Sequence, residues 1–508
     1  MKLKPSITLA LILLFFTSYT SVFAQNRPQN AVNFPRLEPD PKALDFYRLG
    51  RRGGGHTWQE LAEIGLWASG LDPAGGAFSA NLERIRTLTA ALVNSPDLPS
   101  RTKEKADFIL GFLHQNILRS YSVYQTRIDT SLENGVYNCV SSAVLYIILC
   151  EAAGIRTSAV VTREHAFVIV HINGEEIDVE TTNRFGFEPG NRREFHDQFG
   201  RIGFTYVPVQ NYRDRQAITK TELVSLILNN RIADMERRNN FAGSVPLAID
   251  RAALLFGDAL TIPSQNQSQE SLFPDARKDL MDRLLNFGAS LLRGNREEES
   301  IRWAQAASAK YPDSERWQEY TSAAVNNRLT RLIRERRITE AASFLESNKS
   351  ILTDADYAHL ESAVIDADLL QRANQIRTAE EGDSVIAAIE QARQAGKMNE
   401  RRASELITFT IQKTATVLSA APARDWRAAI RYIENALSRT GTNREIEQAL
   451  RTYRNNLAAD YHNRFAAEWN RRNYDEAERI LNEGLAEFPD NRQLLANRET
   501  VNRHRSRQ

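Results

Sequence analysis

The sequence predicts two unlike parts, an α+β domain and a longer, all-α array of helices. Between residues 139 and 182, an apolar helical stretch is followed by two β-branched segments joined by Asn173-Gly174, a strong short signal for a hairpin. From Thr221 to the end, apolar residues recur at three- and four-residue steps, as in amphipathic helices. The chain of 508 residues is also longer than a single core normally supports.

The first 24 residues have the features of a secretory signal peptide. Lys2 and Lys4 precede an apolar stretch from Ile7 to Phe16, and Ala24 ends a Val-Phe-Ala triplet suited to cleavage. A retained membrane anchor is the alternative, but the stretch is shorter than the ~20 residues that a spanning helix needs. We expect an extracytoplasmic bacterial protein, periplasmic or secreted, with no membrane span after signal cleavage.

Charge and cysteine content narrow the function classes. Lys and Arg total 65 against 64 for Asp and Glu, and this balance gives no indication of a nucleic-acid partner. The two cysteines, Cys139 and Cys150, are expected on one helix, roughly 16 Å apart at 1.5 Å rise per residue. Disulfide Cα atoms lie within about 7 Å of each other, so we expect no disulfide between them. Cys150 is then a buried apolar residue and Cys139 a free thiol.

Changes in composition divide the mature chain. Residues 25–40 are polar and contain prolines, which predicts a flexible lead-in, and 41–120 predict a helical segment that packs on the core. We place the α+β domain at 121–214. Its expected elements are a helix at about 139–153, capped by Asn138 and ended by Gly154, and strands at 157–161, 166–172, 176–182 and 206–209.

Residues 215–508 are predicted to form degenerate helix pairs. The stretch from Asn473 to Asp490 resembles the tetratricopeptide repeat, and the stretch from Gly294 to Asp313 is a looser copy. Because this repeat recurs about every 34 residues, we expect roughly seven or eight pairs stacked as a solenoid. Such an array would bind a protein partner. A non-repetitive helical bundle is the alternative.

Cys139, His165 and Asp178 have the order and types of a thiol nucleophile, its base and an orienting acid. Cys139 would lie at the N-terminus of its helix, where the helix dipole favours a thiolate. Gln125 is a possible donor to an oxyanion beside the Cys139 N–H. No spacing of His and Cys matches a metal site, and we expect neither a metal nor a cofactor.

Residues from about Tyr121 to Tyr212 resemble a known family. A G-x-x-N-C motif on a helix ending A-x-G-I, then H-A-F on a strand and D-x-E-T on the next, is similar to the bacterial transglutaminase-like branch of the papain-like fold. The helices that follow are similar to the tetratricopeptide-like helices of extracytoplasmic transglutaminase-like proteins. The resemblance implies a triad of Cys139, His165 and Asp178 and acyl transfer through a thioester. It implies neither a substrate nor calcium.

The acid of the triad has two candidates. The family-like spacing favours Asp178. A two-residue turn at Asn173-Gly174 would instead place Asp178 opposite Ile169 and bring Glu180 nearer to His165. We expect Asp178 and keep Glu180 as the alternative.

These features predict a thiol acyltransferase or peptidase of transglutaminase-like type that acts on peptide, amide or isopeptide bonds, with its helical repeats bound to a protein partner. The alternative is a catalytically inactive peptide-binding or scaffold protein in which the helical repeats carry the function. A sulfur close to the His165 ring would favour the enzyme.

Overall fold

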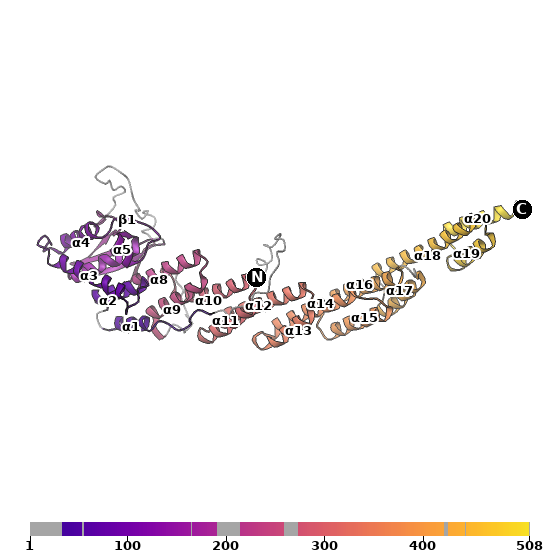
Figure 1. Cartoon of the computed structure of the whole chain (residues 1–508), viewed down its shortest axis with the longest axis horizontal. Coiled ribbons are helices and arrows are strands. Elements are labelled where there is room, and N and C mark those ends of the chain that lie inside the picture. Colours follow the sequence, from indigo (N-terminus) through magenta and orange to yellow (C-terminus); the bar gives the residue numbers. More distant parts are fainter. Residues whose placement is uncertain are drawn as a thin grey trace, which may run out of the picture.

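The computed structural model describes residues 33–506, except 53–54, 164, 190–213, 259–272, 421–424 and 442. Most described residues lie in helices, and small sheets occur only toward the N-terminal end of this part, which confirms the predicted helical array in outline. The molecule is elongated, with the strands at one end and the C-terminus at the other (Figure 1). No described helix is both long and apolar enough to cross a membrane. The expected signal peptide (1–24) and the expected strand at 206–209 lie outside the described residues.

The strand-containing part is built on one buried helix, α6 (Cys139–Ala152). This helix is apolar around its circumference, and all residues from Val140 to Cys150 are buried, as expected of a helix surrounded by protein. Four strands form an antiparallel sheet on one side of it: β3 (Thr157–Val161), β4 (Ala166–Ile172), β5 (Glu175–Val179) and β6 (Gln216–Ile218). Their order in the sheet is β5-β4-β3-β6.

The β4–β5 hairpin closes through a two-residue turn. Asn173 and Gly174 both have positive φ, 49° and 89°, as type I′ turns require. Ile169 consequently pairs with Asp178. This register confirms the hairpin that Asn173-Gly174 predicts, and it decides which acid can reach the start of β4.

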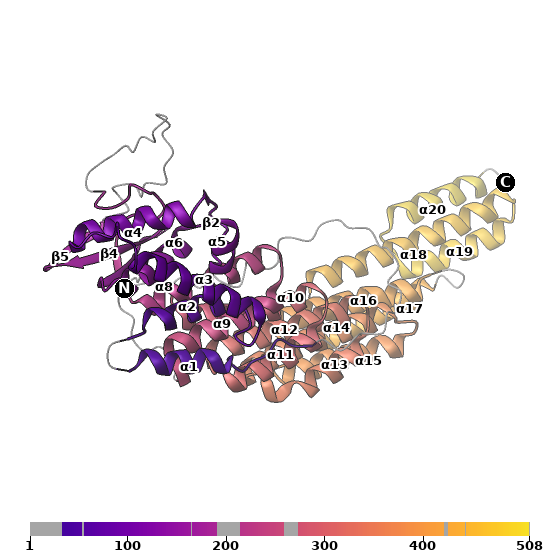
Figure 2. The same ribbon diagram turned by 60° about the vertical axis from the view of Figure 1, so that its left-hand side comes forward.

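Shorter elements precede α6 and surround it. They are α1 (Pro41–Gly50), α2 (Trp58–Ala68), α3 (Gly76–Val93), α4 (Thr102–Asn116), β1 (Ser120–Tyr121), α5 (Ile128–Asn134) and β2 (Val136–Tyr137). Helices α2, α3 and α4 pack on α6, and α4 also packs on β4 (Figure 2). The short strands β1 and β2 pair in parallel, and β2 leads directly into α6.

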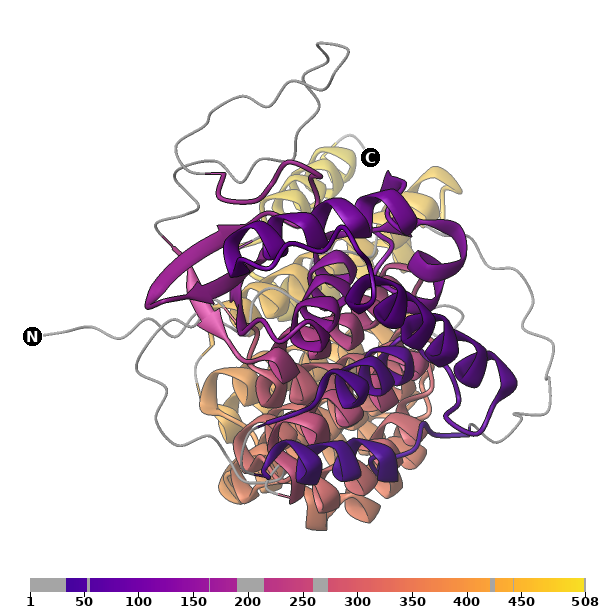
Figure 3. The ribbon, with the colours of Figure 1, turned by 90° about the vertical axis from the view of Figure 1, so that its left-hand side faces the viewer.

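The core does not break at the expected boundary between residues 214 and 215. Helix α8 (Lys220–Arg237) packs on α2 and α6, and α9 (Phe241–Phe256) packs on α8 and α1. One continuous set of buried side chains runs from Ala43 to Trp317. The expected division is therefore corrected, because the first helices of the array complete the core of the α+β part. Seen along the molecule's length, the α+β part lies in front of the helical array (Figure 3).

The remaining described helices continue the array toward the C-terminus. They are α10 (Ala276–Arg293), α11 (Glu297–Lys310), α12 (Ser314–Arg334), α13 (Ile338–Ser347), α14 (Asp354–Asn374), α15 (Ala379–Gln394), α16 (Glu400–Leu418), α17 (Trp426–Thr440), α18 (Arg444–Asn470), α19 (Tyr474–Glu487) and α20 (Arg492–Arg505). Each packs on the next, and α10, α12, α14, α16, α18 and α20 also pack on one another in succession. In the described part, α8 to α19 form six pairs and α20 is single, fewer than the expected seven or eight pairs.

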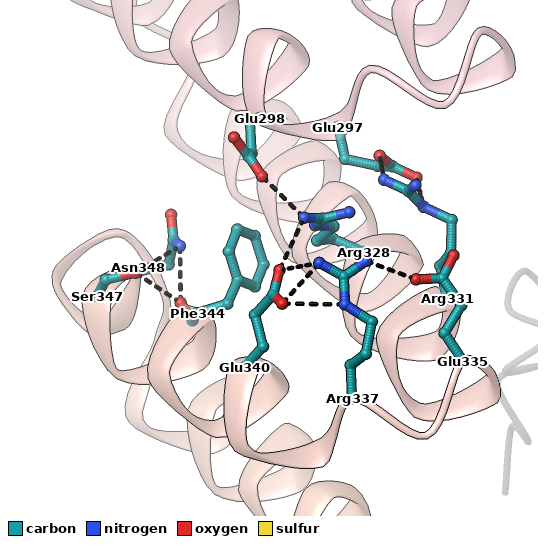
Figure 4. Close-up of polar contacts among 10 residues, drawn as sticks. All are labelled: Glu297, Glu298, Arg328, Arg331, Glu335, Arg337, Glu340, Phe344, Ser347 and Asn348. Atoms are coloured by element: carbon teal, nitrogen blue, oxygen red, sulfur yellow. Dashed lines mark hydrogen bonds and ion pairs between the residues drawn. The ribbon is translucent and has the colours of Figure 1, made fainter. Parts of the chain in front are cut away.

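Polar contacts between successive pairs occur at a nearly constant sequence separation. The partners are 34 to 36 residues apart in Asp282–Arg316, Glu297–Arg331, Glu361–Lys397, Asp366–Arg402 and Thr408–Asn443. This separation matches the tetratricopeptide period and favours a repeat over an irregular bundle. At one junction, shown in Figure 4, Arg331 reaches Glu297 while Arg328 lies between Glu298 and Glu340.

Residues 33–40, the described part of the expected flexible lead-in, lie across the first helices of the array. Phe34 meets the rings of Phe287 and Trp303 edge-on, with centroids 6.5 and 5.6 Å away. Arg36 pairs with buried Asp250 at 2.5 Å. The expectation of a flexible segment is therefore corrected for these residues, because both apolar and charged contacts hold them in place.

We predict that a fragment of residues 216–508 is less stable and more prone to association than the full chain. It would uncover the face of α8 that α2 and α6 bury, where Leu223, Val224 and Ile227 are at most 2% exposed. Each such side chain exposed to water costs about 1.5–3 kcal/mol. Size-exclusion chromatography and binding of a hydrophobic dye measure this effect. A fragment of 353–508, which cuts the array between helix pairs, is the control and should bind less dye. A monomeric 216–508 with no more dye than the control would contradict the shared core.

Candidate active site

Cys139 is the first residue of α6, and a helix cap fixes its position. The side-chain oxygen of Asn138 accepts hydrogen bonds from the N–H groups of Val140 and Ser141, both at 3.0 Å. The Ser141 hydroxyl accepts from the Asn138 N–H at 2.9 Å. In the described part of the chain, no acceptor takes the N–H of Cys139 itself. The half-buried thiol thus lies at the positive end of the helix dipole, where an anion is stabilised.

The segment after β5 is tied to the same end of α6. The hydroxyls of Ser142 and Thr181 lie 2.9 Å apart, and both side chains are buried. The Tyr137 hydroxyl donates to the carbonyl of Thr182 at 3.0 Å. These contacts hold residues 180–182 beside the N-terminus of α6.

His165 lies just before β4 and contacts a buried acid. Its Nε2 is 2.6 Å from Oε2 of Glu180, and the two side chains are only 9% and 5% exposed. The other carboxylate oxygen of Glu180 accepts hydrogen bonds from the Thr182 N–H at 3.1 Å and from its hydroxyl at 2.6 Å. Because Glu180 occupies Nε2, Nδ1 is the ring nitrogen left for the thiol of Cys139.

The pKa of His165 reflects both neighbours. Burial lowers this pKa, but the charge of Glu180 and the hydrogen bonds to Cys139 and Glu180 outweigh burial and raise the pKa to about 10. The ring is therefore an imidazolium at neutral pH. A cation and proton donor thus lies next to the thiol, as nucleophilic cysteine chemistry requires.

The structure does not bring Asp178 to His165. Asp178 lies opposite Ile169 in the sheet, and its carboxylate accepts two hydrogen bonds from Arg215, at 2.9 and 2.8 Å. The preference for Asp178 as the orienting acid is therefore corrected in favour of Glu180. The reason is the two-residue turn, which places Asp178 too far along the strand.

Gln125 lies close to the site but already uses its side-chain amide. The amide nitrogen donates to the carbonyls of Arg127 and Val136, at 2.8 and 2.9 Å, and the amide oxygen accepts from the Arg127 N–H. These bonds fix the loop before α5. They leave no amide hydrogen of Gln125 for an oxyanion.

Tyr121 is a neighbour of Cys139 that sequence reasoning missed. It pairs with Tyr137 across the β1–β2 ribbon, and the two rings meet edge-on with centroids 5.9 Å apart. Its hydroxyl is a hydrogen-bonding partner of the Cys139 thiol. Two-residue strands have no periodicity in sequence, so no pattern signals this pairing.

The second cysteine plays no part in the site. Cys150 lies inside α6, is fully buried, and forms no disulfide with Cys139, as the sequence predicts. Burial raises the pKa of the Cys150 thiol well above its usual range. Cys150 is therefore an unreactive packing residue.

Comparison with known proteins gives no assignment. No protein-family model matches the chain, and no curated protein matches it. Among the described residues, no cluster of three or more His, Cys, Asp or Glu side chains could hold a metal ion. The functional argument therefore rests on the geometry around Cys139.

We predict that iodoacetamide labels Cys139 and not Cys150 in the native protein. Cys139 is partly exposed beside an imidazolium, whereas Cys150 is buried and its thiol pKa is raised. Peptide mass spectrometry after labelling at pH 6.5 measures the difference. The urea-unfolded protein is the control and should be labelled at both positions. Equal labelling of the native protein, or a disulfide between the two cysteines, would contradict the arrangement.

We predict that Glu180→Gln lowers the pKa of His165 from about 10, whereas Asp178→Asn leaves it nearly unchanged. Without the Glu180 charge, less opposes burial, which disfavours the imidazolium. The charged ring should then be lost at a lower pH than in the wild type. NMR titration of the imidazole in histidine-labelled protein measures this pKa. A larger drop in Asp178→Asn than in Glu180→Gln would restore Asp178 as the partner.

Proposed function

We propose that the chain is a cysteine acyltransferase or peptidase of transglutaminase-like type that acts on peptide, amide or isopeptide bonds. The observation that carries the proposal is the arrangement of Cys139, His165 and Glu180. A thiol at a helix N-terminus adjoins an imidazole whose other nitrogen is 2.6 Å from a buried carboxylate. This is the arrangement in which a thiolate attacks a carbonyl and an oriented imidazolium protonates the leaving group.

In the proposed reaction, the sulfur of Cys139 forms a bond to the substrate carbonyl carbon, and the amide C–N bond then breaks. The leaving amine takes its proton from His165, and Glu180 stabilises the imidazolium until that transfer. Water or a second amine next attacks the thioester and His165 accepts the proton of the attacking molecule. The C–S bond then breaks and releases the product and the Cys139 thiolate. Water gives hydrolysis and an amine gives transfer, so access to the thioester decides between peptidase and transferase.

The resemblance to the transglutaminase-like family supports the proposal, because the cysteine, the histidine and the acid occur in the same order along the chain. Cys139 begins helix α6, His165 immediately precedes strand β4, and the acid immediately follows strand β5. The acid departs from the family-like pattern, since Glu180 takes the place that the resemblance gives to Asp178. The longer side chain of Glu180 begins two residues farther along the hairpin and reaches the same imidazole.

The rest of the chain suggests where such an enzyme would act. The basic and apolar leader supports an extracytoplasmic location, periplasmic or secreted. Stacked helix pairs offer extended surfaces for a protein, which supports a protein partner bound along the array. We include both points in the proposal.

We predict that an activated peptide ester forms a covalent acyl-enzyme on Cys139. Intact-mass spectrometry measures the adduct, and peptide mapping locates it. Cys139→Ala should abolish the adduct and Cys150→Ala should retain it, because Cys150 is a buried packing residue. Glu180→Gln should slow acylation by about 10- to 100-fold, a smaller loss than in serine proteases because a thiolate depends less on proton removal.

Two outcomes would decide against the enzyme. One is the absence of any adduct on wild-type protein whose Cys139 still reacts with iodoacetamide, which would favour the scaffold function. The other is an adduct that persists in Cys139→Ala.

A further inference from the structure

Tyr121 lies beside Cys139, at the end of the short β1–β2 pairing. The β1–β2 pairing places Tyr121 next to Tyr137, and the Ser122 N–H donates to the Tyr137 carbonyl at 2.8 Å. The side-chain amide of Asn138, the residue that caps α6, donates to the carbonyl of Val123 at 3.4 Å. The residues that follow Tyr121 are thus joined to the residues that lead into Cys139.

The hydroxyl of Tyr121 keeps its proton at neutral pH. Burial, followed by the charge of Cys139, raises the pKa of Tyr121 above its usual range. The hydroxyl can therefore donate a hydrogen bond next to the reacting sulfur. The neighbouring Tyr137 cannot take this role, because its hydroxyl donates to the carbonyl of Thr182.

Attack by Cys139 on a carbonyl places negative charge on the carbonyl oxygen, and such an oxyanion is stabilised by fixed donors. The N–H of Cys139, which no described acceptor takes, supplies one donor at the helix end. The amide hydrogens of Gln125 are bound to backbone carbonyls and cannot supply the second. Apart from His165, whose proton goes to the leaving amine, the described side chain that offers a donor next to the thiol is the hydroxyl of Tyr121.

We propose that the Tyr121 hydroxyl is the second hydrogen-bond donor to the oxyanion formed at Cys139, an assignment that rests on the proposed function. As the S–C bond forms, the carbonyl π electrons move to oxygen, and the hydrogen bond of Tyr121 moves from sulfur to that oxygen. When the C–N bond breaks, the carbonyl reforms and the amine takes its proton from His165. Tyr121 keeps its proton throughout and acts only as a donor.

Two reactions of the same thiol test this assignment. Acylation by an activated ester passes through an oxyanion, whereas alkylation by iodoacetamide substitutes at a saturated carbon and forms none. Tyr121→Phe should therefore slow acylation by about 10²-fold, the lower end of losses for one oxyanion donor, and change alkylation of Cys139 by less than about threefold. Tyr124→Phe is the matched control. Its side chain is 72% exposed, and neither rate should change.

The outcomes separate this assignment from the proposed function. Wild-type protein that forms no acyl-enzyme overturns both. If wild-type protein forms the acyl-enzyme, two results overturn the role of Tyr121 alone. One is that Tyr121→Phe acylates at the wild-type rate, and the other is that Tyr121→Phe loses acylation and alkylation equally. If Tyr121→Phe does not fold, the variants Tyr121→Gln and Tyr121→Leu replace it. Their side chains are similar in size, but only glutamine can donate a hydrogen bond. Faster acylation by the Gln variant supports the assignment, and equal or slower acylation overturns it.

Discussion

The burial of α6 is the constraint on which the rest of the α+β part depends. A helix that is apolar on all sides gains about 1.5–3 kcal/mol for each large side chain it buries, so it needs neighbours around its whole circumference. Helices α2, α3, α4 and α8 and the sheet supply them. The N-terminus of α6 meets polar groups from Asn138 and from the segment after β5. Cys139 lies at this end, so the packing of the core also sets the position of the thiol.

The contact between His165 and Glu180 is hard to explain by stability alone. Burial alone would lower the pKa of His165, and only the neighbouring charge and hydrogen bonds reverse that effect. Buried ion pairs often stabilise no more than apolar side chains of similar size, and loss of one partner costs about 3–5 kcal/mol. A charged pair held at the end of a helix next to a half-buried thiol is more readily explained by chemistry.

Local signals in the sequence predicted the local structure well. The Asn138 cap and the Asn173-Gly174 turn each fix a few adjacent residues, and α6, β3 and β4 begin and end close to where the sequence places them. The same turn also predicted that Glu180 lies nearer to His165 than Asp178 does, but the family-like spacing was given more weight. The β1–β2 pairing and the core shared across residues 214 and 215 were not predictable, because they depend on contacts between segments far apart in the chain.

The shared core bears on how the helical array could serve the site. An array joined by a flexible linker would bring a bound protein to Cys139 only through a raised effective concentration. Here α8 packs directly on α6, and residues 33–40 bind α9, α10 and α11 through Asp250, Phe287 and Trp303. The start of the array is therefore fixed by packing to the helix that bears the thiol. A protein bound there would meet Cys139 in a defined orientation. Cys139 would then react with the acyl group that this orientation places next to the thiol, so position as well as chemical type would determine which group reacts.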